Sequence, residues 1–151
     1  MNVGYYLMSL SINRSALVLH SSERMSALVN DVASYPLFLP WCSQANVLEH
    51  HEDFMVASIV VQKGAIRQTF TTRNDLSVEG RILMDLVDGP FKYLKGAWDF
   101  IHLKEDACKV VLTLDFELKQ NLAKVAFGAV FNQAANSMVD AFCERANQVY
   151  R

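Results

Sequence analysis

The histidines are the side chains of this chain best suited to acid–base chemistry, but their sequence context supports them weakly. His102 is the strongest candidate for a general acid or base, because it shares strand parity with Trp98 and Phe100. It stands near a strand end, and no carboxylate on the same parity could orient it. His50 and His51 fall in a predicted turn. The pattern therefore predicts no catalytic residue and a protein that is not an enzyme, with an acid–base reaction at His102 as the alternative.

The cysteines offer no better support for metal or redox chemistry. The three thiols, Cys42, Cys108 and Cys143, are odd in number and far apart in the sequence. Their spacing matches neither a zinc site nor a disulfide framework. We therefore predict reduced thiols in a cytosol-like compartment and no metal site.

The segment Tyr35-Pro-Leu-Phe-Leu-Pro-Trp-Cys42 combines large apolar side chains with two prolines. Proline cannot continue a helix and pushes the residue before it toward extended geometry, so the segment should form a stiff corner. Such an apolar corner packs onto a core, closes the mouth of a cavity or meets a partner. Apolar residues are common both in cores and on surfaces, and the pattern leaves these three alternatives open.

Period-two alternation of apolar and polar residues predicts a long antiparallel meander after this corner. Before the corner, an apolar strand is expected from Ile12 to Leu19, and Ser21 or Ser22 caps a helix that ends near Asp31. The strands of the meander are expected at Val47–His51, Phe54–Lys63, Ile66–Val78, Arg81–Val87, Tyr93–Leu103 and Lys109–Lys119.

A long apolar helix follows the meander. Asn121 is a suitable N-cap for it, and its main apolar stripe consists of Phe127, Phe131, Ala134, Met138, Phe142 and Val149. A helix of this kind after a meander predicts an α+β fold in which a curved sheet of about seven strands wraps around the helix. The stripe either fills a solid core or lines a cavity between the helix and the sheet.

Length, net charge and hydropathy limit the number of domains and the kinds of partner that the chain can have. The 151 residues favour a single domain over residues 12–151, with residues 1–11 as an N-terminal extension that is partly disordered or precedes the true start. A net charge of −2 gives no global basic field, so bulk attraction to nucleic acid is not indicated. The apolar N-terminus is far too short to span a membrane. We expect a cytoplasmic protein with no transmembrane segment.

Three motifs carry a resemblance to a known family: Val29-Asn-Asp-Val-Ala-Ser-Tyr-Pro-Leu-Phe-Leu-Pro-Trp-Cys42, Asp88-Gly-Pro-Phe-Lys-Tyr-Leu-Lys-Gly-Ala-Trp-Asp-Phe100 and Met138-Val-Asp-Ala-Phe-Cys-Glu-Arg-Ala146. The segment Phe70-Thr-Thr-Arg-Asn74 adds to the likeness, which runs from Ile12 to the C-terminus. Together these segments resemble the ubiquinone-binding START-domain family, which is related to the polyketide cyclases, and the likeness is strongest toward the bacterial ribosome-association toxins of that family.

The resemblance implies a helix-grip fold with a hydrophobic cavity. Its leading functional implication is non-enzymatic binding of ubiquinone or an isoprenoid precursor in support of respiration, with no other cofactor and with peripheral contact to the inner membrane. The alternative is a toxin that binds the large ribosomal subunit, blocks subunit association and pairs with a small ubiquitin-like antitoxin. A polyketide cyclase or aromatase-like enzyme is the second alternative.

A cavity for a prenylated quinone needs mostly apolar walls and a few polar groups. Arg14, which shares strand parity with Ile12, Ala16 and Val18, is the candidate polar anchor. The apolar candidates would surround the space between sheet and helix: Phe38 and Trp41 at the mouth, Phe70, Trp98, Phe100 and Phe116 on the sheet, and Met138 and Phe142 on the helix. Each of them also fits an ordinary core position.

Four basic residues are candidates for contacts with ribosomal RNA. Arg67 and Arg73 share the outward face of one strand, and Lys92 and Lys95 flank Tyr93. Contacts of such side chains with phosphates would weaken as salt rises. Simple solvation of surface charges explains the same pattern, and acidic neighbours dilute the local field.

Overall fold

The computed structural model describes residues 9–150, with side-chain surroundings for all of them except residues 9 and 122–124. The elements follow the predicted order and form the α+β helix-grip fold, which confirms the predicted fold class. They are β1 (Ser9–Val18), α2 (Ser22–Asn30), the 3-10 helix η1 (Val32–Leu37), β2 (Cys42–His50), β3 (Phe54–Lys63), β4 (Ile66–Asp75), β5 (Arg81–Asp88), β6 (Phe91–Lys104), β7 (Ala107–Leu118) and α3 (Leu122–Val149).

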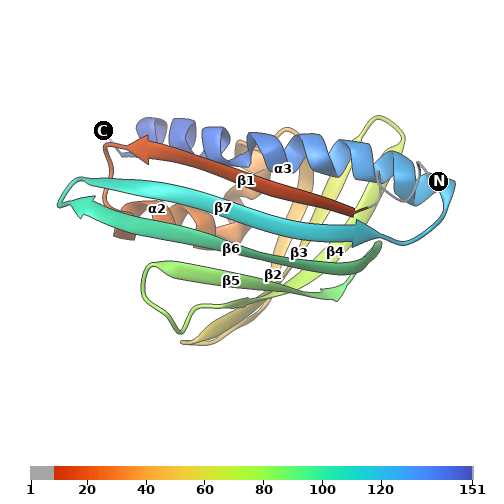
Figure 1. The fold of residues 1–151 in the computed structure, drawn as a ribbon, viewed down its shortest axis with the longest axis horizontal. Coiled ribbons are helices and arrows are strands. Elements are labelled where there is room, and N and C mark those ends of the chain that lie inside the picture. Colours follow the sequence, from red (N-terminus) through yellow and green to blue (C-terminus); the bar gives the residue numbers. More distant parts are fainter. Residues whose placement is uncertain (1–8, 151) are drawn as a thin grey trace.

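All seven strands belong to one antiparallel sheet with the order β1-β7-β6-β5-β4-β3-β2. Figure 1 shows β3 and β4 running at a steep angle to β6 and β7, so the sheet is strongly curved, and α3 extends along β1 on one side of it. A sheet with one apolar face and a helix with one apolar side can bury both only against each other. None of the helices between residues 9 and 150 has the length and apolar character needed to cross a membrane.

Some strand boundaries differ from the prediction. β1 begins at Ser9 rather than Ile12, because Leu10 pairs with Phe116 and packs against the core; residues 1–8 of the predicted extension lie outside the described residues. β4 ends at Asp75 rather than Val78. There the backbone N–H and the hydroxyl of Ser77 both donate to the Asp75 carboxylate, at 2.8 and 2.6 Å, and close a turn.

The proline-rich corner folds back onto the core. η1 contains Pro36, and the corner buries Tyr35 and Leu39 while Leu37 stays 73% exposed. The Tyr35 hydroxyl donates to the Val29 carbonyl, which fastens the corner to the end of α2. Of the three alternatives that the sequence left open, packing onto the core therefore holds for Tyr35 and Leu39.

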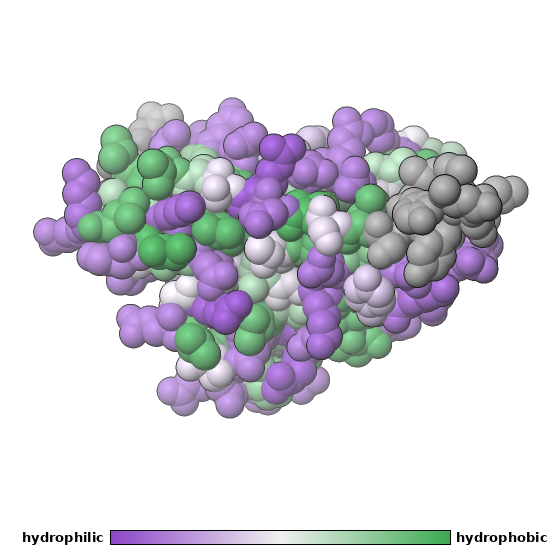
Figure 2. Space-filling view, viewed as in Figure 1, coloured by the Kyte–Doolittle hydropathy of each residue, from purple (hydrophilic) through white to green (hydrophobic). Residues whose placement is uncertain are grey.

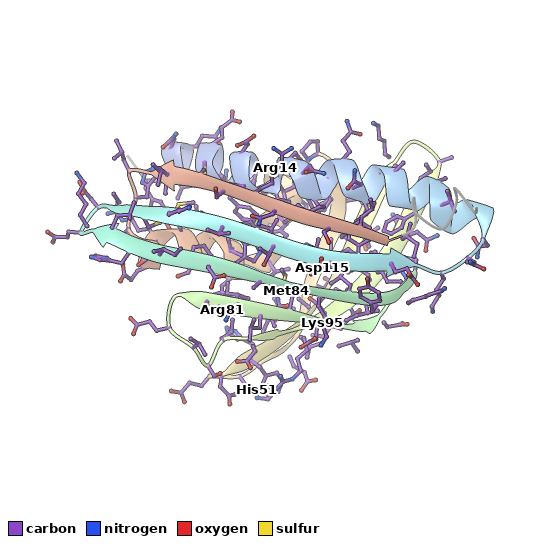
Figure 3. The ribbon with its side chains drawn as sticks, viewed as in Figure 1. Arg14, His51, Arg81, Met84, Lys95 and Asp115 are labelled. Atoms are coloured by element: carbon purple, nitrogen blue, oxygen red, sulfur yellow. The ribbon has the colours of Figure 1, made fainter. Side chains whose placement is uncertain are left out.

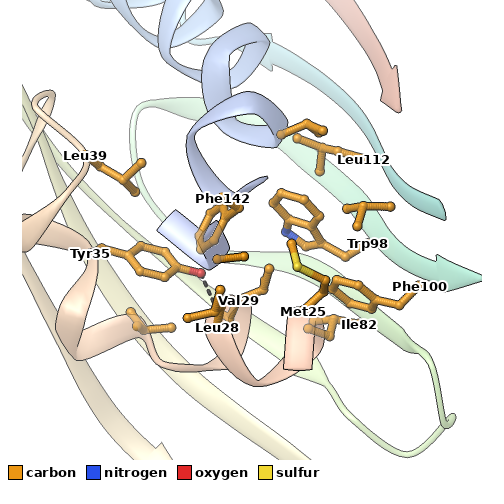
Figure 4. Close-up of a cluster of buried hydrophobic side chains, with 14 of the residues drawn as sticks. Met25, Leu28, Val29, Tyr35, Leu39, Ile82, Trp98, Phe100, Leu112 and Phe142 are labelled. Carbon is orange, nitrogen blue, oxygen red and sulfur yellow. Dashed lines mark hydrogen bonds between the residues drawn. The ribbon is translucent and has the colours of Figure 1, made fainter. Parts of the chain in front are cut away.

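Two clusters of buried side chains make up the core. One lies where α2, η1 and the C-terminal half of α3 meet the sheet, and Figure 4 shows Tyr35, Trp98 and Phe142 at its centre. The other surrounds Phe116 and Phe131, whose ring centroids are 4.9 Å apart in a T-shaped contact. Partly buried side chains that pack against both clusters mark the junction between them: Trp41, Ile59 and Met84.

Candidate functional site

A small, partly enclosed cavity of about 60 Å³ lies at the junction of the two clusters. Four of the predicted ligand-binding residues line it: Trp41, Phe70, Trp98 and Met138. The apolar stripe of α3 therefore both fills the core and borders a space, through Phe131, Ala134 and Met138. An engineered protein cavity that admits benzene measures about 150 Å³, so a quinone ring needs more room than this cavity offers.

Four other predicted ligand-binding residues lie outside the cavity wall. Phe100 is stacked on Trp98, with centroids 6.2 Å apart. Phe116 and Phe142 are fully buried in the two core clusters. Phe38 is half-buried at the corner, where its ring meets Phe142 at 5.2 Å. These four side chains support the wall and are not part of it.

Arg14, the predicted polar anchor, points away from the cavity. Its side chain is exposed, and its Nε donates to Asn136 Oδ1 on α3 at 3.0 Å. The parity argument was misleading at this edge strand, because Arg14 lies beside the helix and not over the sheet interior, as Figure 3 shows.

The polar groups of the cavity come instead from β4. Thr72 and Asn74 are buried on its inner face and line the cavity, and the Thr72 hydroxyl donates to Asn74 Oδ1 at 2.9 Å. The sequence analysis did not select this pair as ligand-binding. Two polar residues on the same parity as Phe70 were the available signal, since a buried polar side chain inside an apolar wall is uncommon. The side-chain amide of Asn74 also has N–H groups, which could donate a hydrogen bond to an oxygen atom of a ligand.

Trp41 separates the cavity from an open groove of about 460 Å³ between α3 and the β3–β4 hairpin. Its side chain and Ala134 line both spaces. The Trp41 Nε1 atom is buried without a hydrogen-bond partner, and it is the sole such side-chain nitrogen or oxygen within the described part of the chain. A buried donor without an acceptor is costly, so this position favours a ligand that supplies an acceptor. The sequence analysis placed Trp41 at the mouth of a cavity, and its contact with a ligand stays a prediction.

The cavity wall has little capacity for acid–base catalysis. Among its described lining residues there is no histidine, carboxylate, lysine, arginine or cysteine. Tyr35 lines it, but its hydroxyl donates to Val29 and burial raises its pKa far above the ordinary range. His102 is exposed at the end of β6, away from the interior where parity had placed it. The arrangement can bind and orient a molecule, and it supplies no proton donor or acceptor that titrates near neutrality.

The thiol of Cys42, at the start of β2, makes the stability of the folded protein depend on pH. Burial raises the pKa of the Cys42 thiol from 9.0 to about 11, so the folded state holds the proton more tightly than the unfolded state. The resulting stabilisation is complete below pH 9.0 and is lost as the pH rises toward about 11. The free energy of unfolding should therefore decrease less between pH 9.0 and about 11 in Cys42→Ala than in the wild type. Urea denaturation at successive pH values measures this difference. Equal pH profiles for the variant and the wild type would contradict this assignment.

The four predicted RNA-contacting cations lie on the outer face of the sheet, where most have acidic neighbours. Lys92 forms an ion pair with Glu117 at 3.2 Å, and Lys95 stands between Asp85 and Asp115 on the neighbouring strands. Figure 3 shows Lys95 and Asp115 together on this face, and Figure 2 shows hydrophilic side chains interspersed with apolar ones there. The remaining two make other contacts: Arg73 is opposite Asp85 with its guanidinium 4.1 Å from the Phe54 ring centroid, and Arg67 donates to Gln62 at 2.9 Å.

Solved structures show the same fold. The Zhui aromatase/cyclase from Streptomyces sp. R1128 is similar over 95% of this chain and 96% of its own, with a TM-score of 0.82 at 19% identity. A START superfamily protein from Mycobacterium smegmatis covers 92% of this chain and 98% of its own, with a TM-score of 0.77 at 18% identity. These likenesses confirm the helix-grip architecture.

Sequence relatives are closer. Proteins named "Ribosome association toxin RatA" are 54% identical in Vibrio cholerae, covering 92% of this chain and 96% of the relative, and 49% identical in Escherichia coli K12, covering 98% and 96%. A Xenopus laevis protein named "Coenzyme Q-binding protein COQ10 homolog B, mitochondrial" is 25% identical over 86% of this chain and 55% of its own. The family described as polyketide cyclase / dehydrase and lipid transport matches residues 18–143, and the chain therefore belongs to that family.

Proposed function

We propose that this chain is a non-enzymatic binding protein that holds an apolar, oxygen-bearing molecule between α3 and the sheet. A quinone or an isoprenoid precursor is the ligand class that we favour. The observation that carries the proposal is the buried Thr72–Asn74 pair in an otherwise apolar wall, next to a groove that Trp41 closes off. The distant relative named as a coenzyme Q-binding protein supports the same ligand class.

The size of the cavity determines how such a ligand would bind. A ring larger than the cavity needs Trp41 to move, so that the cavity and the groove become one space. The carbonyl oxygens of the ring would then accept from Asn74, while the tail lies along the groove. Burial contributes about 0.8 kcal/mol per CH₂ group, so the tail supplies much of the affinity.

Mass spectrometry of an organic extract tests this proposal on protein purified without detergent. We expect a stoichiometric quinone or prenylated precursor, and we expect the affinity of added short-tail quinone to change little between low and high salt. An empty extract from a well-folded protein that also refuses added quinone would contradict the proposal. A steep decrease in quinone affinity with salt would contradict its apolar basis.

Ribosome association is the second candidate function, and it has the stronger support from sequence relatives. The relatives that bear this name are 54% and 49% identical to the chain and match it along nearly all of its length. In this role the chain binds the large ribosomal subunit in the cytoplasm, prevents subunit joining and pairs with a small ubiquitin-like antitoxin. Sedimentation of purified subunits tests it: added protein should reduce the joined ribosome and co-migrate with the large subunit. Unchanged profiles would contradict this role.

A cyclase or aromatase function is less favoured. It rests on the fold of a neighbour at 19% identity, whereas the described residues of the cavity lining include no histidine, carboxylate, lysine, arginine or cysteine that could transfer a proton near neutral pH. Peripheral contact with the inner membrane remains a proposal too. The exposed apolar side chains at one end of the sheet are the surface on which to test it: Leu17, Leu19, Ile101 and Leu103.

A further inference from the structure

The outward side of α3 carries an uncharged polar surface, which we call the α3 face and define by Asn132, Gln133, Asn136 and Ser137. Gln133 and Ser137 are exposed, and Asn132 and Asn136 are half-buried. The surrounding sequence from 118 to 139 contains no aspartate or glutamate, although the whole chain carries a net charge of −2. The next residue of the helix, Asp140, is an exposed carboxylate one turn beyond Asn136, at the edge of this surface.

Three exposed cations border the α3 face, and each donates a hydrogen bond to the side-chain oxygen of an asparagine or glutamine. Lys63 Nζ, from the end of β3, donates to Gln133 Oε1 at 3.2 Å. Arg14 Nε, from β1, donates to Asn136 Oδ1 at 3.0 Å. Gln133 and Asn136 are three residues apart on the helix and so lie side by side, with one cation reaching them from each flank.

Arg67 adds a third cation at the same β3–β4 hairpin, where it lies on the outer side of β4. Its Nη1 donates at 2.9 Å to Oε1 of Gln62, a residue that lines the groove beside α3 together with Lys63, Gln133 and Ser137. An amide partner fixes the position of a guanidinium or ammonium group without neutralising it. Among the described residues, none of these three cations forms a salt bridge with a carboxylate, so a partner outside the chain can contact them without displacing one.

Farther from this hairpin, the cations on the outer face of the sheet have carboxylates beside them. Lys92 pairs with Glu117 at 3.2 Å and Arg81 pairs with Asp99 at 3.1 Å. Lys95 lies between two aspartates on its neighbouring strands. A partner rich in phosphates would have to compete with these carboxylates, and it would meet no such competitor among the residues that define the α3 face.

We propose that the α3 face, with Arg14, Lys63 and Arg67 at its border, is the surface that contacts ribosomal RNA phosphates. This inference rests on the proposed ribosome association and replaces most of the basic residues that the sequence had suggested. The amides of the face provide donors and acceptors for sugar and base edges, and the groove gives the face a concave centre.

Binding of purified large ribosomal subunits by two matched triple variants tests the proposal. One variant is Arg14→Gln, Lys63→Gln and Arg67→Gln, and the other is Arg73→Gln, Lys92→Gln and Lys95→Gln; each removes three exposed positive charges. The α3-face variant should bind the subunit at least about tenfold more weakly in low salt, with a log–log salt slope that is shallower by about two to three. The outer-face variant should stay close to the wild type.

Two further results distinguish failure of this surface from failure of the role. If the wild type binds the subunit and the α3-face variant binds equally well, the surface assignment is wrong and ribosome association stands. If the wild type binds no subunit, the role itself fails and the surface with it. Arg14→Lys together with Arg67→Lys should keep the wild-type salt slope, because charge and not guanidinium shape is required. Equal melting temperatures would show that all variants fold.

Discussion

Trp41→Ala is expected to speed ligand release at least about tenfold, while it costs only about 1–2 kcal/mol of unfolding free energy. The Trp41 side chain stands between the small cavity and the open groove, so its removal joins the two spaces. The stability cost is modest because Trp41 is only partly buried, and because the variant also removes a buried N–H that has no acceptor. Stopped-flow release of a short-tail quinone and thermal melting measure the two effects.

Trp98→Ala is the matched control, since it removes the other tryptophan of the chain. Trp98 is 2% exposed and packs against Phe142 with ring centroids 5.4 Å apart. Its loss should cost about 3–5 kcal/mol and lower the melting temperature by roughly 6–20 °C. If Trp41→Ala destabilises the protein as much as Trp98→Ala does, or leaves the release rate unchanged, Trp41 is an ordinary core residue and not the barrier between the two spaces.

The fold could be predicted from the sequence because its signals are local and repeated. Alternation along β4 placed Phe70, Thr72 and Asn74 on one face, and the structure buries all three. The stripe of α3 was correct from Phe127 to Phe142, and it failed at Val149, the last residue of the helix, which is 46% exposed. Periodicity identifies the side of an element that faces inward, but it does not show where the core ends.

The candidate site was harder to predict because a cavity depends on what fills the space between elements. Phe116 and Phe142 have the residue type and parity of ligand contacts, yet neighbouring rings cover them from the cavity side. Arg14 has the parity of an interior residue, but at an edge strand it reaches the helix instead. Lys63 was not selected, because its amide partner Gln133 is seventy positions away in the chain. Contacts between distant segments decided each of these cases.

The double variant Thr72→Val and Asn74→Leu is expected to weaken quinone binding about tenfold, the result of losing one or two hydrogen bonds to the ligand. Affinity for a hydrocarbon of similar size should not change, so the variant should lose its preference for oxygen-bearing molecules. The fold should be as stable as the wild type or slightly more stable. Both partners of the buried hydrogen bond are replaced by apolar groups of similar shape, which leaves no unpaired polar atom behind.

Thr71→Val serves as the control, because Thr71 neighbours Thr72 on the same strand but has the opposite parity and is absent from the cavity wall. It should bind quinone like the wild type. Competition between a short-tail quinone and its hydrocarbon analogue, measured by fluorescence quenching of the two tryptophans, gives the ratio of the two affinities for each protein. If the double variant keeps the wild-type ratio, the polar pair does not contact the ligand oxygen. The preference would then have to come from the unpartnered Trp41 Nε1, and Trp41→Phe would remove it.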